Sequence, residues 1–104
     1  MTQKTWNRLS FFEQLSNIDG EVKRLVWTHE RHLENSNIED YSEEYLAKIQ
    51  KLLKMTMFDP KNYAKGYRFV ELTDEVNEIK RYLQGGTTGD YILRYWDEFT
   101  KAIS

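Results

Sequence analysis

The side chains of this chain best suited to catalysis or metal binding belong to four consecutive residues, His29, Glu30, Arg31 and His32. Two imidazoles three positions apart share one face of a helix, so His29 and His32 could bind a metal ion together. The spacing is not the His-Glu-x-x-His motif, and no glutamate stands three positions before either histidine, as di-iron bundles require. A catalytic metal needs further ligands. We therefore expect no metal and no cofactor, and a site at His29 and His32 is the alternative.

Arg24 and His29 form an Arg-x4-His spacing. This spacing resembles the Arg-x4–6-His signature of the HEPN (higher eukaryotes and prokaryotes nucleotide-binding) family, all-helical proteins that include dimeric, metal-independent ribonucleases. The resemblance implies that Arg24 stabilises phosphate charge and that His29 acts in acid–base cleavage of RNA. The match covers these two residues alone, and on a straight helix they point about 140° apart. RNA binding or cleavage is thus an alternative function, beside a surface arginine and a histidine on an apolar stripe.

Basic and aromatic residues alternate at Lys61, Tyr63, Lys65, Tyr67 and Arg68. Such a surface could hold phosphate and stack a nucleobase. With a net charge of −2, however, the chain has no overall field that attracts nucleic acid. Tyrosines of this kind more often pack their rings on the end of a bundle and leave the lysines in water. Nucleic-acid binding through Lys61, Lys65 and Arg68 is therefore a further alternative.

The C-terminal segment carries four large aromatic residues, Tyr91, Tyr95, Trp96 and Phe99. One helical stripe buries three or four positions, and together with Tyr82 these rings exceed what the core of a small bundle needs. Tyrosine and tryptophan are favoured anchors of protein interfaces. We predict that the four aromatic residues bind a protein partner or a second copy of the chain, with core packing as the alternative.

Helices must position these residues, and the first predicted helix has the clearest sequence signals for its start and its buried face. Ser10 and Glu13 form a Ser-x-x-Glu capping box, and apolar residues at steps of three and four follow up to Leu33. Gly20 interrupts this stripe and weakens the helix. We expect a neighbouring helix or Trp96 to approach closely there, so that Gly20→Leu destabilises the fold by about 1 to 3 kcal/mol through overpacking.

The same signals recur along the chain. Asp40 and Glu43 repeat the capping pattern, Pro60 ends the second helix, and Gly85 and Gly86 end a short third one. A threonine or Asp90 caps the last helix. The predicted helices are 11–33, 41–58, 69–84 and 91–103. Trp6 and Leu9 precede them and are expected to fold over one end.

Short connections between successive helices predict an all-α fold, an antiparallel up-and-down four-helix bundle in a single domain of residues 1–104. Hydrophobic residues make up 39% of the chain and charged ones 31%, which is too apolar for a disordered segment. The absence of cysteine excludes disulfides and thiolate metal sites. Without a leader or an apolar run of about 18 residues, neither export nor a membrane is expected, and the location is cytoplasmic.

Several short motifs together are similar to a group of small, uncharacterised prokaryotic all-helical proteins. They are Leu-Ser-Phe-Phe-Glu-Gln at 9–14, Asn-Ile and Glu-Val at 17–18 and 21–22, Asp-Pro-Lys-Asn at 59–62, and the aromatic C-terminal helix. The resemblance implies a helical fold and a prokaryotic source, and it implies no activity. From the residues we predict a non-enzymatic interaction module.

Overall fold

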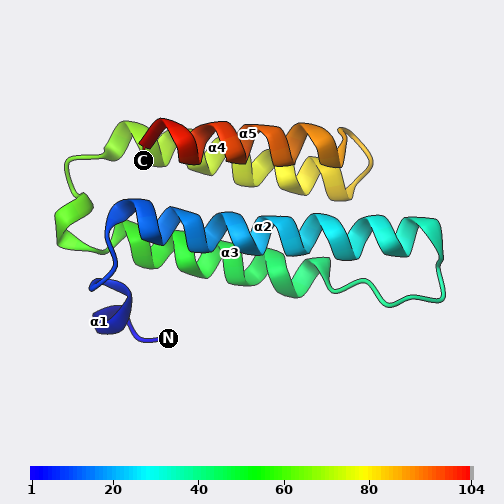
Figure 1. Ribbon diagram of the computed structural model, residues 1–104, viewed down its shortest axis with the longest axis horizontal. Helices are drawn as coiled ribbons and strands as arrows, with labels where there is room; N and C mark the ends of the chain where they lie inside the picture. Colours follow the sequence, from blue (N-terminus) through cyan, green and yellow to red (C-terminus); the bar gives the residue numbers. More distant parts are fainter. Residues whose placement is uncertain (104) are drawn as a thin grey trace.

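The computed structural model describes residues 1–103 of the chain, and within them every regular element is helical (Figure 1). The elements in chain order are α1 (Gln3–Trp6), α2 (Phe11–Glu34), α3 (Ser42–Met57), the 3-10 turn η1 (Pro60–Asn62), α4 (Gly66–Leu83) and α5 (Gly89–Ile103). The predicted all-α fold class is confirmed for the described residues, which contain no strand.

The four long helices lie in two pairs, and the chain reverses direction between the members of each pair (Figure 1). Helix α2 packs extensively against α3 and also against α5, and α4 packs against α5. Helices α3 and α4, like α4 and α5, contact one another much more sparsely than α2 and α3 do. The neighbouring pair α3 and α4 therefore leaves a seam in the fold.

Helix α2 begins as its sequence predicts. The Glu13 backbone N–H donates to the Ser10 hydroxyl oxygen at 3.1 Å, and the Ser10 N–H donates to the Glu13 carboxylate at 3.0 Å. This reciprocal capping box satisfies two amides that have no partner inside the helix. The Ser10 bonds also hold the pKa of Glu13 below its usual value.

Helix α3 begins differently from the prediction. It starts at Ser42 after Tyr41, an N-cap residue whose side chain makes no cap bond. The Asp40 carboxylate, one position earlier, accepts from the Ser42 N–H at 2.9 Å through one oxygen and lies 2.7 Å from His29 Nδ1 through the other. The predicted Asp40–Glu43 capping box is therefore wrong.

Other boundaries also differ from the prediction. Helix α4 begins at Gly66, three positions before Phe69, its first buried apolar residue and the point where periodicity places its start. Helix α1 has four residues, too few for any periodicity.

The core takes apolar side chains from all four long helices and from α1. Trp6 is 1% exposed, which confirms that the segment before α2 folds over one end. The other buried apolar residues are Leu15, Ile18, Val22, Leu25, Val26, Leu46, Ile49, Leu52, Leu53, Met55, Phe69, Leu72, Val76, Ile79, Tyr82, Ile92, Trp96 and Phe99.

A buried polar network lies among these apolar residues at the end where α1 and η1 meet. The Gln14 side-chain amide donates to the Trp6 carbonyl at 3.0 Å and to the Asp59 carboxylate at 2.8 Å. The Asn62 side chain donates to Gln14 Oε1 at 2.9 Å and to the Thr56 carbonyl at 3.0 Å. The Trp6 indole N–H donates to the Thr56 hydroxyl at 2.9 Å. These five residues join α1, α2, α3 and η1.

The Asp59 carboxylate is charged in this network. Burial raises the pKa of Asp59, but hydrogen bonds from Lys61 and Gln14 outweigh burial and hold that pKa below its usual range. Gln14 therefore faces a charged acceptor.

Gly20 does not meet a neighbouring helix. The nearest atom to a Cβ placed there is Arg24 Nη1 at 3.6 Å, which belongs to a flexible surface side chain. The expected close approach of a helix or of Trp96 is therefore wrong, and Gly20 is a helix-interior glycine with room for a side chain.

We predict that Gly20→Ala stabilises the fold by about 1 kcal/mol, because alanine lowers the backbone entropy lost on helix formation and meets no clash. For a domain of this size the melting temperature rises by roughly 4 to 8 °C. Gly86→Ala is the matched control, because a Cβ there would lie 2.6 Å from Arg81 Cγ. Thermal unfolding followed by circular dichroism measures both variants, and a loss of stability in Gly20→Ala contradicts the prediction.

We predict that Gln14→Met destabilises the fold by about 2 to 3 kcal/mol, since it keeps the side-chain volume but removes hydrogen bonds from the Trp6 carbonyl, Asp59 and Asn62. Asn17→Ala is the control on the same helix, because its bond to the Glu13 carbonyl is exposed. Urea unfolding measures the difference. Equal midpoints for the two variants would show that the network contributes no stability.

Candidate functional site

His29 is held in place between two side chains. Its Nδ1 lies 2.7 Å from the Asp40 carboxylate, its ring meets the Tyr82 ring edge-to-face at 5.1 Å, and its side chain is 12% exposed. Burial raises the pKa of Asp40, but hydrogen bonds with His29 and Ser42 keep that pKa below its usual value. His29 thus anchors the loop between α2 and α3.

His32 holds the same loop at a second point. Its Nδ1 lies 2.7 Å from the Ile38 carbonyl oxygen, so this nitrogen carries the hydrogen and donates it. Among residues 1–103, no three His, Cys, Asp or Glu side chains gather in a way that could hold a metal ion. The alternative metal pair of His29 and His32 therefore has no third ligand in the described part of the chain.

Arg24 and His29 are not brought together within one copy of the chain. The Arg24 guanidinium lies 3.0 Å from the Glu21 carboxylate, and its side chain is 59% exposed. Arg24 lines a cleft of about 820 Å³ between α2 and α5, and His29 lines the adjoining cleft of about 480 Å³ beside the loop between α4 and α5; Glu30 and Gly89 border both. Neither cleft is lined by both residues of the ribonuclease hypothesis.

Lys61, Lys65 and Arg68 each have a partner inside the chain. Lys61 forms an ion pair with the buried carboxylate of Asp59, and Lys65 lies over the Phe11 ring at 5.1 Å. Arg68 lies over two aromatic rings and pairs with a carboxylate of its own helix. All three cations contribute to local packing.

The aromatic residues of α5 divide between core and surface. Trp96 is fully buried and Phe99 is 6% exposed, so these two belong to the core and not to the predicted binding face. Tyr95 is half-buried and stacks on Phe99 at 6.2 Å. Of the four predicted binding residues, Tyr91 alone is largely exposed, at 47%. The fold absorbs the surplus rings because α5 presents one face to both α2 and α4.

Large exposed apolar side chains occur singly on α2, as at Trp27 and Leu33, and five of them gather around the connection from α3 to α4. They are Met57, Phe58, Tyr63, Tyr67 and Val70. In the sequence, Met57 continues the apolar stripe of its helix. Tyr63 and Tyr67 look like tyrosines that pack their rings on the end of the bundle. Val70 could have indicated this surface from the sequence alone. It is apolar, but it directly follows Phe69 and so lies off the buried stripe of α4.

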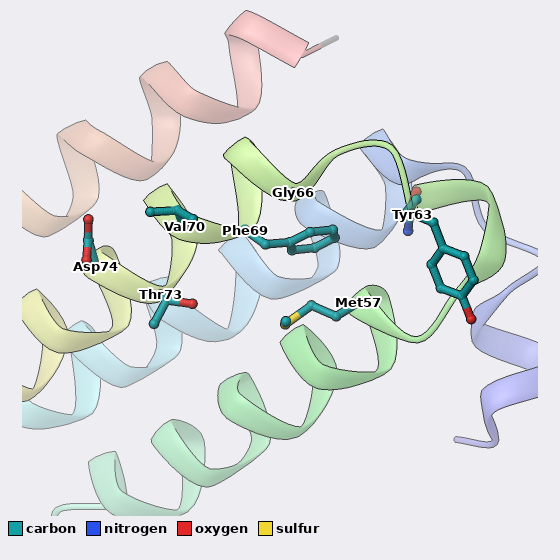
Figure 2. A pocket seen from close by; sticks show the side chains of 8 residues that line it. Met57, Tyr63, Gly66, Phe69, Val70, Thr73 and Asp74 are labelled. Carbon is teal, nitrogen blue, oxygen red and sulfur yellow. The ribbon is translucent and has the colours of Figure 1, made fainter.

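Three of these residues, Met57, Tyr63 and Val70, line a groove between α3 and α4. Its widest part has a volume of about 440 Å³, and Figure 2 shows Met57 and Phe69 between the two helices, with Tyr63 at one end. Two smaller parts, of about 200 Å³ and 290 Å³, follow along the same two helices. The first two parts share Met57 and Thr73, and the second and third share Lys80. We call this continuous feature the α3–α4 groove.

The side chains along the groove explain why it stays open. Its buried apolar residues are Leu46, Leu53, Phe69 and Val76. Polar residues stand beside them on both helices, namely Gln50, Lys54, Thr73, Asn77 and Lys80. Helices close on one another where apolar ridges fit into grooves, and polar side chains at the facing positions of α3 and α4 prevent such a fit.

No protein-family model, curated protein or solved structure matches this chain. In residues 1–103, no helix combines the length and the apolar character that crossing a lipid bilayer requires.

On the side of α4 away from the groove, Glu75 is a buried carboxyl group. It is 6% exposed, and its Oε2 has no hydrogen-bond partner among the described residues. Burial raises the pKa of Glu75 to about 7, and the negative charges of Glu78, Asp74 and Glu71 contribute. Burial, followed by the charges of Glu75 and Glu71, also raises the pKa of Tyr95 on α5 to about 12.

We predict that Glu75 makes the fold less stable as the pH rises. The pKa of about 7 in the folded chain exceeds the usual 4.5, so the folded state binds the proton more tightly. The stabilisation is present below about pH 4.5 and is lost as the pH rises to about 7.

Glu75→Gln keeps the neutral form at every pH and should stabilise the fold by roughly 2 to 3 kcal/mol at pH 8, with a much smaller effect at pH 5. Urea unfolding at the two pH values measures this, with the exposed Glu98→Gln as the control. An effect of Glu75→Gln that does not change with pH would refute the assignment.

Proposed function

We propose that this chain is a non-enzymatic helical interaction module that binds a helix of a protein partner in the α3–α4 groove. The observation that carries the proposal is the continuous groove itself, which combines a buried apolar floor with exposed Met57, Tyr63 and Val70 at one end. Partner helices commonly dock in such grooves through apolar residues at positions i, i+3 or i+4, and i+7.

The length of the groove suits a helix of ordinary size. Helix α3 forms one wall with 16 residues, which span on the order of 24 Å at the rise of an α-helix. A partner helix of about four turns would match this wall along its whole length.

We further infer that the four long helices form one up-and-down antiparallel bundle in a single domain. The alternating helix directions in Figure 1 and the packing of α2 against α3 and α5 support this arrangement. In such a bundle α3 and α4 would be the loosely packed neighbours. A docked helix would cover the apolar side chains that this seam leaves accessible.

The side chains that could do chemistry have other roles in the fold. His29 bonds Asp40, and Arg24 bonds Glu21. These contacts support a binding role above a catalytic one. The competing binding surface is the remainder of the predicted aromatic face on α5, Tyr91 with part of Tyr95.

The test starts from a display library of 16-residue helical peptides selected on the folded chain. We expect the selected helices to share an apolar stripe, and Thr73→Arg to weaken their binding at least about tenfold. Thr73 is exposed and lines the junction of two parts of the groove, so a long charged side chain there obstructs the site without disturbing the core.

Tyr91→Arg on α5 is the matched control, and circular dichroism checks that both variants fold. Binding that survives Thr73→Arg but is lost in Tyr91→Arg moves the site to the α5 face. Failure to select any helix overturns the proposal.

A further inference from the structure

Two lysines stand beside the apolar floor in the middle of the α3–α4 groove. Lys54 lies on α3 and Lys80 on α4, and both line the stretch that contains Leu53 and Val76. Both residues are exposed, and neither ammonium group has a hydrogen-bond or ion-pair partner among the described residues. The groove therefore carries uncompensated positive charge at its centre.

Two lysines at the closely packed helix contacts are paired with carboxylates of the facing helix. Lys23 on α2 lies 3.1 Å from Asp97 on α5, and Lys48 on α3 lies 2.9 Å from Glu21 on α2. Lys54 and Lys80 also stand between two helices, yet no carboxylate of α3 or α4 among the described residues pairs with either of them.

The end of the groove near Tyr63 has the opposite charge, because Asp74 lines it and no cation does. At the other end, Glu43 stands beside Lys80. Acidic residues on a docked helix would be repelled at the Asp74 end and attracted at the middle. Charge complementarity across an interface of this kind sets orientation and selects among partners.

We infer that the partner helix carries carboxylates at the middle of its apolar stripe, placed to pair with Lys54 and Lys80. This inference rests on the proposed docking function and adds the chemistry of the partner. As the helix docks, it excludes water from the two lysines, so each ion pair is stronger than a fully exposed one. A helix with lysines at the same positions would leave like charges facing each other inside the groove.

The test compares two synthetic 16-residue peptides that share one leucine stripe. One carries glutamates beside the central leucines, and its match carries lysines at the same positions. By fluorescence anisotropy at low salt, we expect the glutamate peptide to bind the full chain at least about tenfold more tightly. The difference should shrink in high salt because the ion pairs are screened.

The charge-reversed variant Lys54→Glu with Lys80→Glu should reverse this preference. Lys51→Glu is the control, because Lys51 is an exposed lysine on the same helix that does not line the groove. Equal affinities of the two peptides, or a preference that Lys51→Glu changes as much as the double variant does, would overturn the inference.

Thr73→Arg separates this inference from the proposed function. If both peptides bind equally and both lose binding in Thr73→Arg, the groove stands and the charge preference fails. If neither peptide responds to Thr73→Arg, the docking groove fails with it.

Discussion

The side-chain amide of Gln14 is the constraint on which the closed end of the molecule depends. It contacts the Trp6 carbonyl, the Asp59 carboxylate and the Asn62 amide, residues that lie on either side of α2 and α3 in the sequence. Because hydrogen bonds in a dry interior require defined geometry, this one group fixes how α1, α2, α3 and η1 meet. The orientation of η1 then sets where the chain enters α4, and with it the end of the groove at Tyr63.

The sequence was sufficient for the features that follow local rules. The Ser10–Glu13 cap and the apolar stripe of α2 depend only on the spacing of residues within one helix, and both were predicted correctly. Asp40 shows the limit, because its carboxylate bonds the nearby Ser42 N–H and also His29 eleven positions earlier, and local rules do not indicate the second contact. Gly20 shows another, since composition alone does not reveal whether a glycine meets a neighbour or open space.

The candidate site was beyond sequence reasoning for a related reason. Surplus aromatic residues suggested a surface on α5, yet burial depends on how many helices cover that segment, and Trp96 and Phe99 are enclosed by the fold. The groove arises from a pair of helices that fail to close. Lys54 and Thr73 look like ordinary solvent-facing residues in their own helices, and their importance emerges only when α3 and α4 are placed side by side.

The buried polar network lies wholly within residues 1–62, and this has a mechanical consequence. The α2–α3 pair is specified by directional hydrogen bonds, whereas α4 and α5 join it mainly through apolar contacts, which tolerate small sliding displacements. Polar links that reach across run from Tyr82 to Glu30 and from Lys23 to Asp97, and the second is exposed. One wall of the groove is therefore fixed at its Thr56 end by directional hydrogen bonds, whereas the other is held mainly by apolar packing.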